Sequence, residues 1–132
     1  MRFVDTSFWV ALQLARDERH SAAVDLWRTR GGEGMLTTNH VLGETWTFLR
    51  RRAGHAAARA FVDAARRSPS LAVEHVEAHV ETVAWEWLER HDERSYSFVD
   101  ATSFATMRRR RLREALAFDG DFTAAGFVEL RP

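Results

Sequence analysis

The chain contains no cysteine, and no apolar run in it approaches the ~20 residues that a membrane-spanning helix needs. The missing cysteine excludes a disulfide framework and any metal site built on thiolates. The N-terminus carries one arginine and then an apolar run that is broken at Asp5, which is not the layout of a signal peptide. We therefore expect a soluble, cytoplasmic protein with no membrane contact.

An excess of charge of one sign is also missing, because 19 basic and 19 acidic residues cancel. A globally basic nucleic-acid binder is therefore not indicated. Every basic residue is an arginine, and the arginines gather in the segments 50–52, 66–67 and 108–113. Such clusters can bind phosphate groups, but arginine near a helix C-terminus is also favoured by the helix dipole alone. The clusters do not decide between these two roles.

The sequence lacks a phosphate-binding loop and a zinc-binding helix. The glycine-rich stretch "RGGEGM" does not precede a helix and has no Lys–Ser/Thr ending. His75 and His79 are four residues apart, but the zinc-protease motif needs a glutamate directly after the first histidine. Glu77 is two residues after His75 and so does not match the motif. The tryptophans recur at helical spacing among apolar residues, which favours packing over base stacking.

Short apolar segments alternate with helical patterns along the whole sequence. With 132 residues and 45% hydrophobic content, the chain fits one domain spanning 1–132. Short buried strands separated by helices predict a mostly parallel sheet that is covered on both faces. We expect strands at 2–4, 34–38, 71–76, 114–118 and 126–130, and helices at 6–15, 20–30, 40–52, 56–67, 77–91 and 97–113, with Asn39 as the cap of the third helix.

Two carboxylates follow directly on predicted strands. Asp5 ends "RFVD" and Asp119 ends "EALAFD". Ligands of an open parallel sheet bind outside the carboxyl ends of its strands, so both acids stand where a site is expected. A structural role is open to Asp5 as well, since aspartate can cap a helix that begins at Thr6. Placing a carboxylate next to a buried apolar strand costs free energy, and its occurrence at both Asp5 and Asp119 favours a functional role for the two acids.

Two further acids lie among apolar neighbours. Glu44 interrupts "HVLGETWTFL", and Asp100 interrupts "SFVDATSF". Four embedded carboxylates, with no cysteine and no compelling histidine, suit Mg²⁺ or Mn²⁺. A bound divalent ion lowers the pKa of its water and stabilises charge on a leaving oxygen. Hydrolysis of phosphodiester bonds is the natural use of such a site.

In this order and spacing, these segments resemble the PIN-domain ribonucleases, in particular the VapC toxins of bacterial and archaeal toxin–antitoxin pairs. The likeness runs nearly end to end and rests on "FVDTSFWVAL", "LTTNHVLGETWTFLRRR", "YSFVDATSFATMRRR" and "ALAFDGDF". It implies a three-layer α/β/α sandwich, endonuclease activity on RNA, a homodimer, and inhibition by a cognate antitoxin. It also implies that Mg²⁺ or Mn²⁺ is held by Asp5, Glu44, Asp100 and Asp119.

The same likeness points to three supporting residues. Thr6 and Ser103 match hydroxyl positions that lie near the metals in such proteins. A threonine often stands two residues before the fourth acid, whereas Ala117 stands there in this sequence and a further acid, Asp121, follows. Asp119 and Asp121 are therefore both candidates for the fourth acid, and Asp119 is the favoured one.

Two other functions make different demands on the sequence. A non-catalytic PIN-like module that binds RNA or protein would be expected to have lost one of the four acids, and none is missing. A phosphatase with an aspartyl nucleophile usually has a second acid two residues later, and Ser7 stands there after Asp5. Of the three functions, the metal-dependent ribonuclease is the one that the sequence favours.

Overall fold

The computed structural model describes residues 1–132, which form five strands and seven α-helices, with a short 3-10 helix at Gly31–Glu33. None of the helices has the length and apolar character needed to cross a membrane. The strands are β1 (Arg2–Val4), β2 (Met35–Thr38), β3 (Leu71–Glu74), β4 (Glu114–Leu116) and β5 (Val128–Glu129), and the helices are α1 (Thr6–Gln13), α2 (His20–Arg30), α3 (Asn39–Ala53), α4 (His55–Arg67), α5 (Ala78–Arg90), α6 (Phe98–Arg109) and α7 (Asp121–Ala124).

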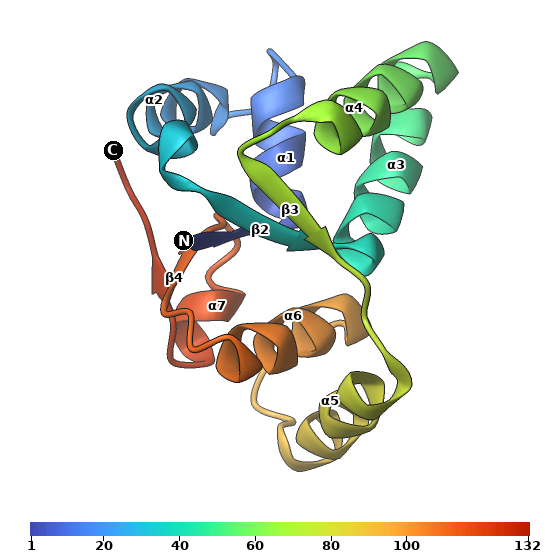
Figure 1. Cartoon of the computed structure of the whole chain (residues 1–132), viewed down its shortest axis with the longest axis vertical. Helices are drawn as coiled ribbons and strands as arrows, with labels where there is room; N and C mark the ends of the chain where they lie inside the picture. The colour runs from blue at the N-terminus through green and yellow to red at the C-terminus, as the bar shows by residue number, and fades with distance from the viewer.

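The strands form one parallel sheet in the order β3-β2-β1-β4-β5. Helices α1 to α4 lie above this sheet in Figure 1, and α5 to α7 lie below it. The predicted three-layer α/β/α sandwich is therefore confirmed, and the sheet is parallel throughout. Strands β2 and β3 extend the sheet to one side of β1, and β4 and β5 extend it to the other side. The strand order thus reverses between β1 and β4, where ligands of such sheets bind.

Apolar side chains fill the space on both faces of the sheet. On one face, Phe3 of β1 contacts Phe122 of α7, whose ring in turn meets the ring of Phe104 edge-on, with centroids 4.9 Å apart. On the other face, Trp9 of α1 packs edge-on against Phe61 of α4 at 5.3 Å. All five side chains are buried. Burial on both faces explains why Phe3 and Val4 follow one another in the central strand β1, where both are fully buried.

The element boundaries differ from the sequence expectations in two instructive places. Thr38, not Asn39, caps α3, because its hydroxyl accepts the backbone N–H of Val41; the Asn39 side chain accepts the N–H of Val76 instead. Helix α6 ends at Arg109 rather than at residue 113. Arg111 adopts a left-handed conformation with φ of 57°, so that the N–H of the following residue closes the last turn.

Candidate metal centre

A cleft of about 400 Å³ opens at the carboxyl ends of β1 and β4. Four of the predicted acids line it, namely Asp5, Glu44, Asp100 and Asp119. They come from the end of β1, from α3, from the first turn of α6 and from the end of β4. Segments that are far apart in the sequence thus bring the four carboxylates to one place. The other lining residues are Thr6, Ser7, Val10, Asp17, Glu18, Arg19, Phe48 and Phe118.

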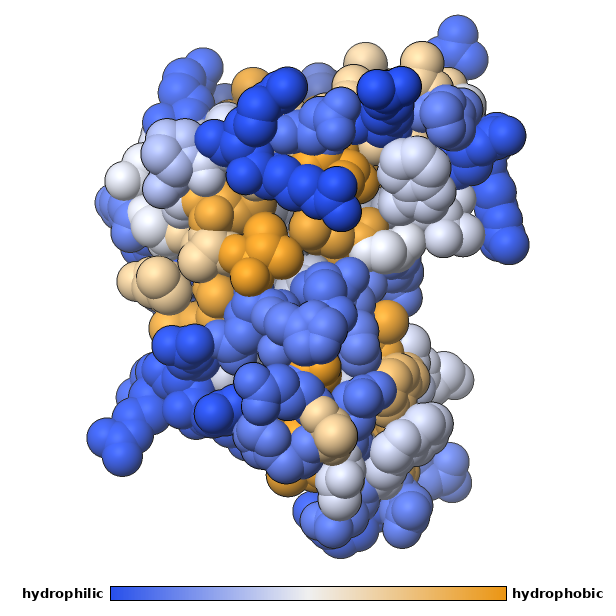
Figure 2. Space-filling model, turned by 45° about the vertical axis from the view of Figure 1, so that its right-hand side comes forward, coloured by the Kyte–Doolittle hydropathy of each residue, from blue (hydrophilic) through white to orange (hydrophobic).

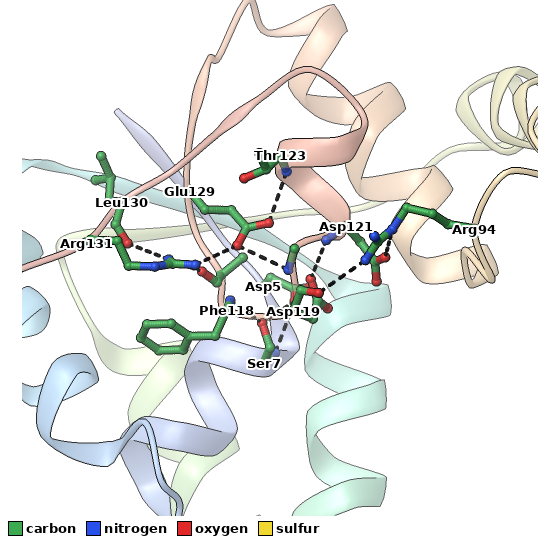
Figure 3. Close-up of polar contacts among 12 residues, drawn as sticks. Asp5, Ser7, Arg94, Phe118, Asp119, Asp121, Thr123, Glu129, Leu130 and Arg131 are labelled. Atoms are coloured by element: carbon green, nitrogen blue, oxygen red, sulfur yellow. Dashed lines mark hydrogen bonds and ion pairs between the residues drawn. The ribbon is translucent and has the colours of Figure 1, made fainter.

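Asp5 caps helix α1 and also lines the cleft. Its carboxylate caps α1 by accepting the backbone N–H of Ser7 at 3.1 Å and the hydroxyl of Ser7 at 2.7 Å. Ser7 Oγ also accepts the backbone N–H of Phe118 at 3.0 Å, which ties β1 to the chain after β4 (Figure 3). Ser7 is the polar residue whose role the sequence interpretation missed. Its position two residues after a strand-ending aspartate is the pattern of a cap, and was the available signal.

Asp100 is likewise held by a helix terminus. The Ser97 hydroxyl accepts the backbone N–H of Asp100, and the Asp100 carboxylate accepts the backbone N–H of Ser97, which forms a reciprocal capping box at the start of α6. This arrangement fixes one carboxylate oxygen on the helix. The other oxygen has no hydrogen-bond partner in the protein, and Asp100 lines the cleft.

Asp119 and Asp121 flank Gly120, whose φ of 82° lets the chain turn sharply into α7. The Asp119 carboxylate accepts the backbone N–H of Asp121, while the Asp121 carboxylate pairs with Arg94 at 2.9 Å (Figure 3). Carboxylate oxygens of Asp100, Asp119 and Asp121 all lie within 4.8 Å of one another. The two candidates for the fourth acid are therefore both close to Asp100, and they differ in that Asp121 carries a cationic partner.

The remaining predicted residues lie outside the group formed by Asp100, Asp119 and Asp121. Asp5 and Glu44 line the cleft, Glu44 from α3, but neither belongs to the compact group of three carboxylates. Thr6 also lines the cleft, and its hydroxyl is buried with no hydrogen-bond partner. Ser103 lies in the buried stripe of α6, outside the residues that line the cleft, and its hydroxyl is unpartnered too.

Burial and the proximity of other carboxylates raise the pKa values of the acids in the cleft. Burial raises the pKa of Asp5 to about 8, the charges of Asp119 and Asp100 add to the rise, and the hydrogen bonds from Ser7 oppose it. Burial also raises the pKa of Asp100 to about 6 and moves the pKa of Asp119 upward. A divalent cation would relieve this repulsion, and an all-oxygen donor set suits Mg²⁺ or Mn²⁺. The unpartnered Thr6 hydroxyl fits a water bound to such an ion, so the residues present fit the expected metal.

The arginine cluster at the C-terminal end of α6 is partly engaged within the protein. The guanidinium of Arg108 lies over the rings of Trp87 and Phe127, and Arg110 forms an ion pair with Glu74. Arg111 supplies the left-handed residue that ends the helix. The structure thus gives at least part of this cluster a packing role. By contrast, Arg19 lines the acidic cleft itself.

A parallel α/β sheet with an acidic cleft at its switch point defines this molecule as an α/β protein with a candidate cation site. The PIN domain family model matches residues 2–128, and the chain belongs to the PIN-domain family. The 23S rRNA-specific endonuclease VapC20 of Mycobacterium tuberculosis, from strains CDC 1551 / Oshkosh and H37Rv, is 61% identical over 132 residues, covering 100% of this chain and 99% of the relative. The crystal structure of M. tuberculosis VapC20, described as a sarcin–ricin loop cleaving toxin, matches with a TM-score of 0.95 at 60% identity and covers 100% of both chains.

Proposed function

We propose that the protein is a Mg²⁺- or Mn²⁺-dependent endoribonuclease and the toxin of a toxin–antitoxin pair. The observation that carries this proposal is the cleft at the switch point, where carboxylates from four elements converge and where the pKa values of Asp5 and Asp100 are raised to about 8 and about 6. Family membership and the 61% identity to an endonuclease supply the reaction type. A non-catalytic module would have no use for so costly a cluster of acids.

The proposal assigns a role to each acid. Asp5, Asp100 and Asp119 hold the cation, and Glu44, from the α3 side of the cleft, either completes the ligand set or orients a water molecule. The bound ion would activate water and stabilise the charge that develops on the leaving oxygen of the phosphodiester. Ser7 and Ser97 keep one oxygen of Asp5 and of Asp100 in place through their hydrogen bonds. The Thr6 hydroxyl is available to orient a metal-bound water, and no comparable contact with the cleft supports the assignment of Ser103.

The substrate class follows from the relative. VapC20 of M. tuberculosis is a 23S rRNA-specific endonuclease that cleaves the sarcin–ricin loop, and this chain takes the same substrate in our proposal. A loop suits such an enzyme, because its unstacked bases can be reached and read, whereas those in a duplex are hidden.

The proposed partners are a cognate antitoxin and a second copy of the chain. An acidic cleft attracts a basic side chain, so an antitoxin tail can compete with metal by placing an arginine among the carboxylates. Arg94 already makes such a contact with Asp121 from within the chain. For a homodimer, the exposed Trp85 and Val73 and an apolar groove between α3, α4 and β3 supply apolar surface. Figure 2 shows apolar patches that interrupt the hydrophilic surface of this part of the molecule.

The direct test is cleavage of RNA by the purified full chain. We expect a stem-loop with the sarcin–ricin sequence to be cut within its loop in the presence of Mg²⁺ or Mn²⁺, and to stay intact in EDTA. A stem-loop of the same length with an unrelated loop controls for sequence preference. Cutting that continues in EDTA would reject the metal mechanism. Binding of the RNA without cutting under every metal condition would favour the non-catalytic module.

A second prediction separates the two candidates for the fourth acid. Asp119→Asn is expected to slow cleavage by at least about 100-fold, because it removes a carboxylate that has no cationic partner in the protein. Asp121→Asn is expected to slow it by only about 10-fold, because Arg94 already neutralises much of the charge of Asp121. Initial rates with excess Mn²⁺ measure both effects. The reverse order of the two losses would assign the metal to Asp121.

A further inference from the structure

Glu129 is a buried carboxylate that the proposed mechanism does not use. Its side chain is only 1% exposed, and it extends from β5 toward the segment that links β4 to α7 (Figure 3). A buried carboxylate is costly unless it is well paired, and Glu129 is paired on both oxygens. Oε1 accepts the backbone N–H of Gly120 at 3.2 Å and a guanidinium N–H of Arg131 at 3.0 Å, while Oε2 accepts the backbone N–H of Thr123 at 3.0 Å.

Arg131 holds the same segment from its other end. Its Nη1 donates to the carbonyl of Ala117 at 2.9 Å and to that of Leu130 at 2.8 Å, and its guanidinium lies over the ring of Phe118, 5.3 Å from the centroid. The pair therefore contacts residues 117, 118, 120 and 123, which bracket Asp119 and Asp121 in the sequence. Helix α7 is only four residues long, so its own hydrogen bonds can do little to fix the turn at Gly120.

We propose that Glu129 and Arg131 are positioning residues that hold the Asp119–Gly120–Asp121 turn in the geometry needed to bind metal. Neither residue lines the cleft, and neither touches the reacting atoms. The contribution is geometric, because the two oxygens of Glu129 hold the backbone N–H groups of Gly120 and Thr123 on either side of the turn, while the guanidinium of Arg131 pairs with its charge. Outer residues that orient metal ligands commonly affect metal affinity by 10- to 100-fold. This inference rests on the proposed metal site.

The test is the affinity of the full chain for Mn²⁺, measured by calorimetric titration, together with kcat and KM for the stem-loop RNA. Glu129→Gln keeps the shape of the side chain but loses the charge and one of the two acceptor oxygens. We expect Mn²⁺ to bind about 10-fold more weakly and kcat to fall by about 10-fold, with KM for RNA unchanged. Arg131→Met should have a similar effect. Because the two residues act on one turn, the losses in the double variant should be clearly less than additive.

Glu74→Gln is the matched control. Glu74 is also a strand-end glutamate with little exposure, 13% of its side chain, and it is also paired with an arginine, Arg110, but it makes no contact with the turn. This variant should keep the Mn²⁺ affinity of the wild type.

Three results would overturn the positioning role. They are unchanged Mn²⁺ affinity in Glu129→Gln, an equal loss in Glu74→Gln, or full additivity in the double variant. If Glu129→Gln does not fold, Arg131→Met, whose native side chain is 43% exposed, decides the question. A wild type that neither binds Mn²⁺ nor cuts RNA would instead refute the proposed function, so the two failures are distinguishable.

Discussion

Asp100→Asn is expected to abolish RNA cleavage, with a loss of at least about 100-fold, while leaving the metal-free protein as stable as the wild type or more stable. The asparagine keeps an oxygen that can accept the Ser97 N–H, so the capping box survives in part. It removes a buried negative charge that Asp119 and Asp121 repel. Unfolding in urea with EDTA at neutral pH measures the stability, and initial rates with Mn²⁺ measure the cleavage.

Two further variants separate the cap from the charge. Asp100→Ala removes both, and should lose about 1 kcal/mol of stability because a capping side chain is gone. Ser97→Ala weakens the cap and leaves the carboxylate, so it should lose a similar stability and keep measurable cleavage. Asp92→Asn, at an exposed acid between α5 and α6, should change neither quantity. A clear drop in stability for Asp100→Asn, with an unchanged response to Mn²⁺, would return Asp100 to a purely capping role.

The sequence was sufficient to predict the order of the five strands and of six of the seven helices, and to single out the four acids that line the cleft, for a physical reason. Strands buried on both faces are plain apolar runs, and a carboxylate that directly follows such a run, as Asp5 does, stands out. Parallel pairing then brings the ends of β1 and β4 to one edge of the sheet. Glu44 and Asp100 do not follow a strand. They were assigned to the same site because their apolar neighbours in the sequence indicated burial.

What the sequence did not reveal depends on contacts between distant segments. Ser7 gains its role from the N–H of Phe118, 111 residues later in the chain. The four-residue helix α7 is too short to leave a periodic signal, and "GDFTAA" resembles a loop. Capping was treated as an alternative to catalysis for Asp5, whereas the structure shows the cap and the cleft position together. One carboxylate has two oxygens, so one oxygen can bind the helix while the other faces the cleft.

The stability of the metal-free protein is expected to fall as the pH rises from about 4 to about 8. Burial raises the pKa of Asp5 from 3.8 to about 8, so over this range the folded chain keeps a proton that the unfolded chain has already released. The folded state therefore binds more protons than the unfolded state, and the free energy of unfolding decreases by up to about 1.4 kcal/mol per pH unit for one such group. Asp100, with its pKa raised to about 6, adds to the fall below pH 6.

Excess Mn²⁺ is expected to make this slope shallower. The ion binds the ionised carboxylates and competes with their protons, so the stabilisation that it gives increases with pH and reaches about 2.7 kcal/mol when its concentration is 100 times the dissociation constant. Asp5→Asn keeps a good N-cap for α1 and removes the titrating group, so its curve in EDTA should be flatter than that of the wild type and should respond much less to Mn²⁺. Urea unfolding at a series of pH values, with EDTA and with Mn²⁺, measures all four curves. A wild-type curve that is flat between pH 4 and pH 8 in EDTA, or that keeps its slope when Mn²⁺ is added, would mean that Asp5 is an ordinary ionised cap with no part in binding metal.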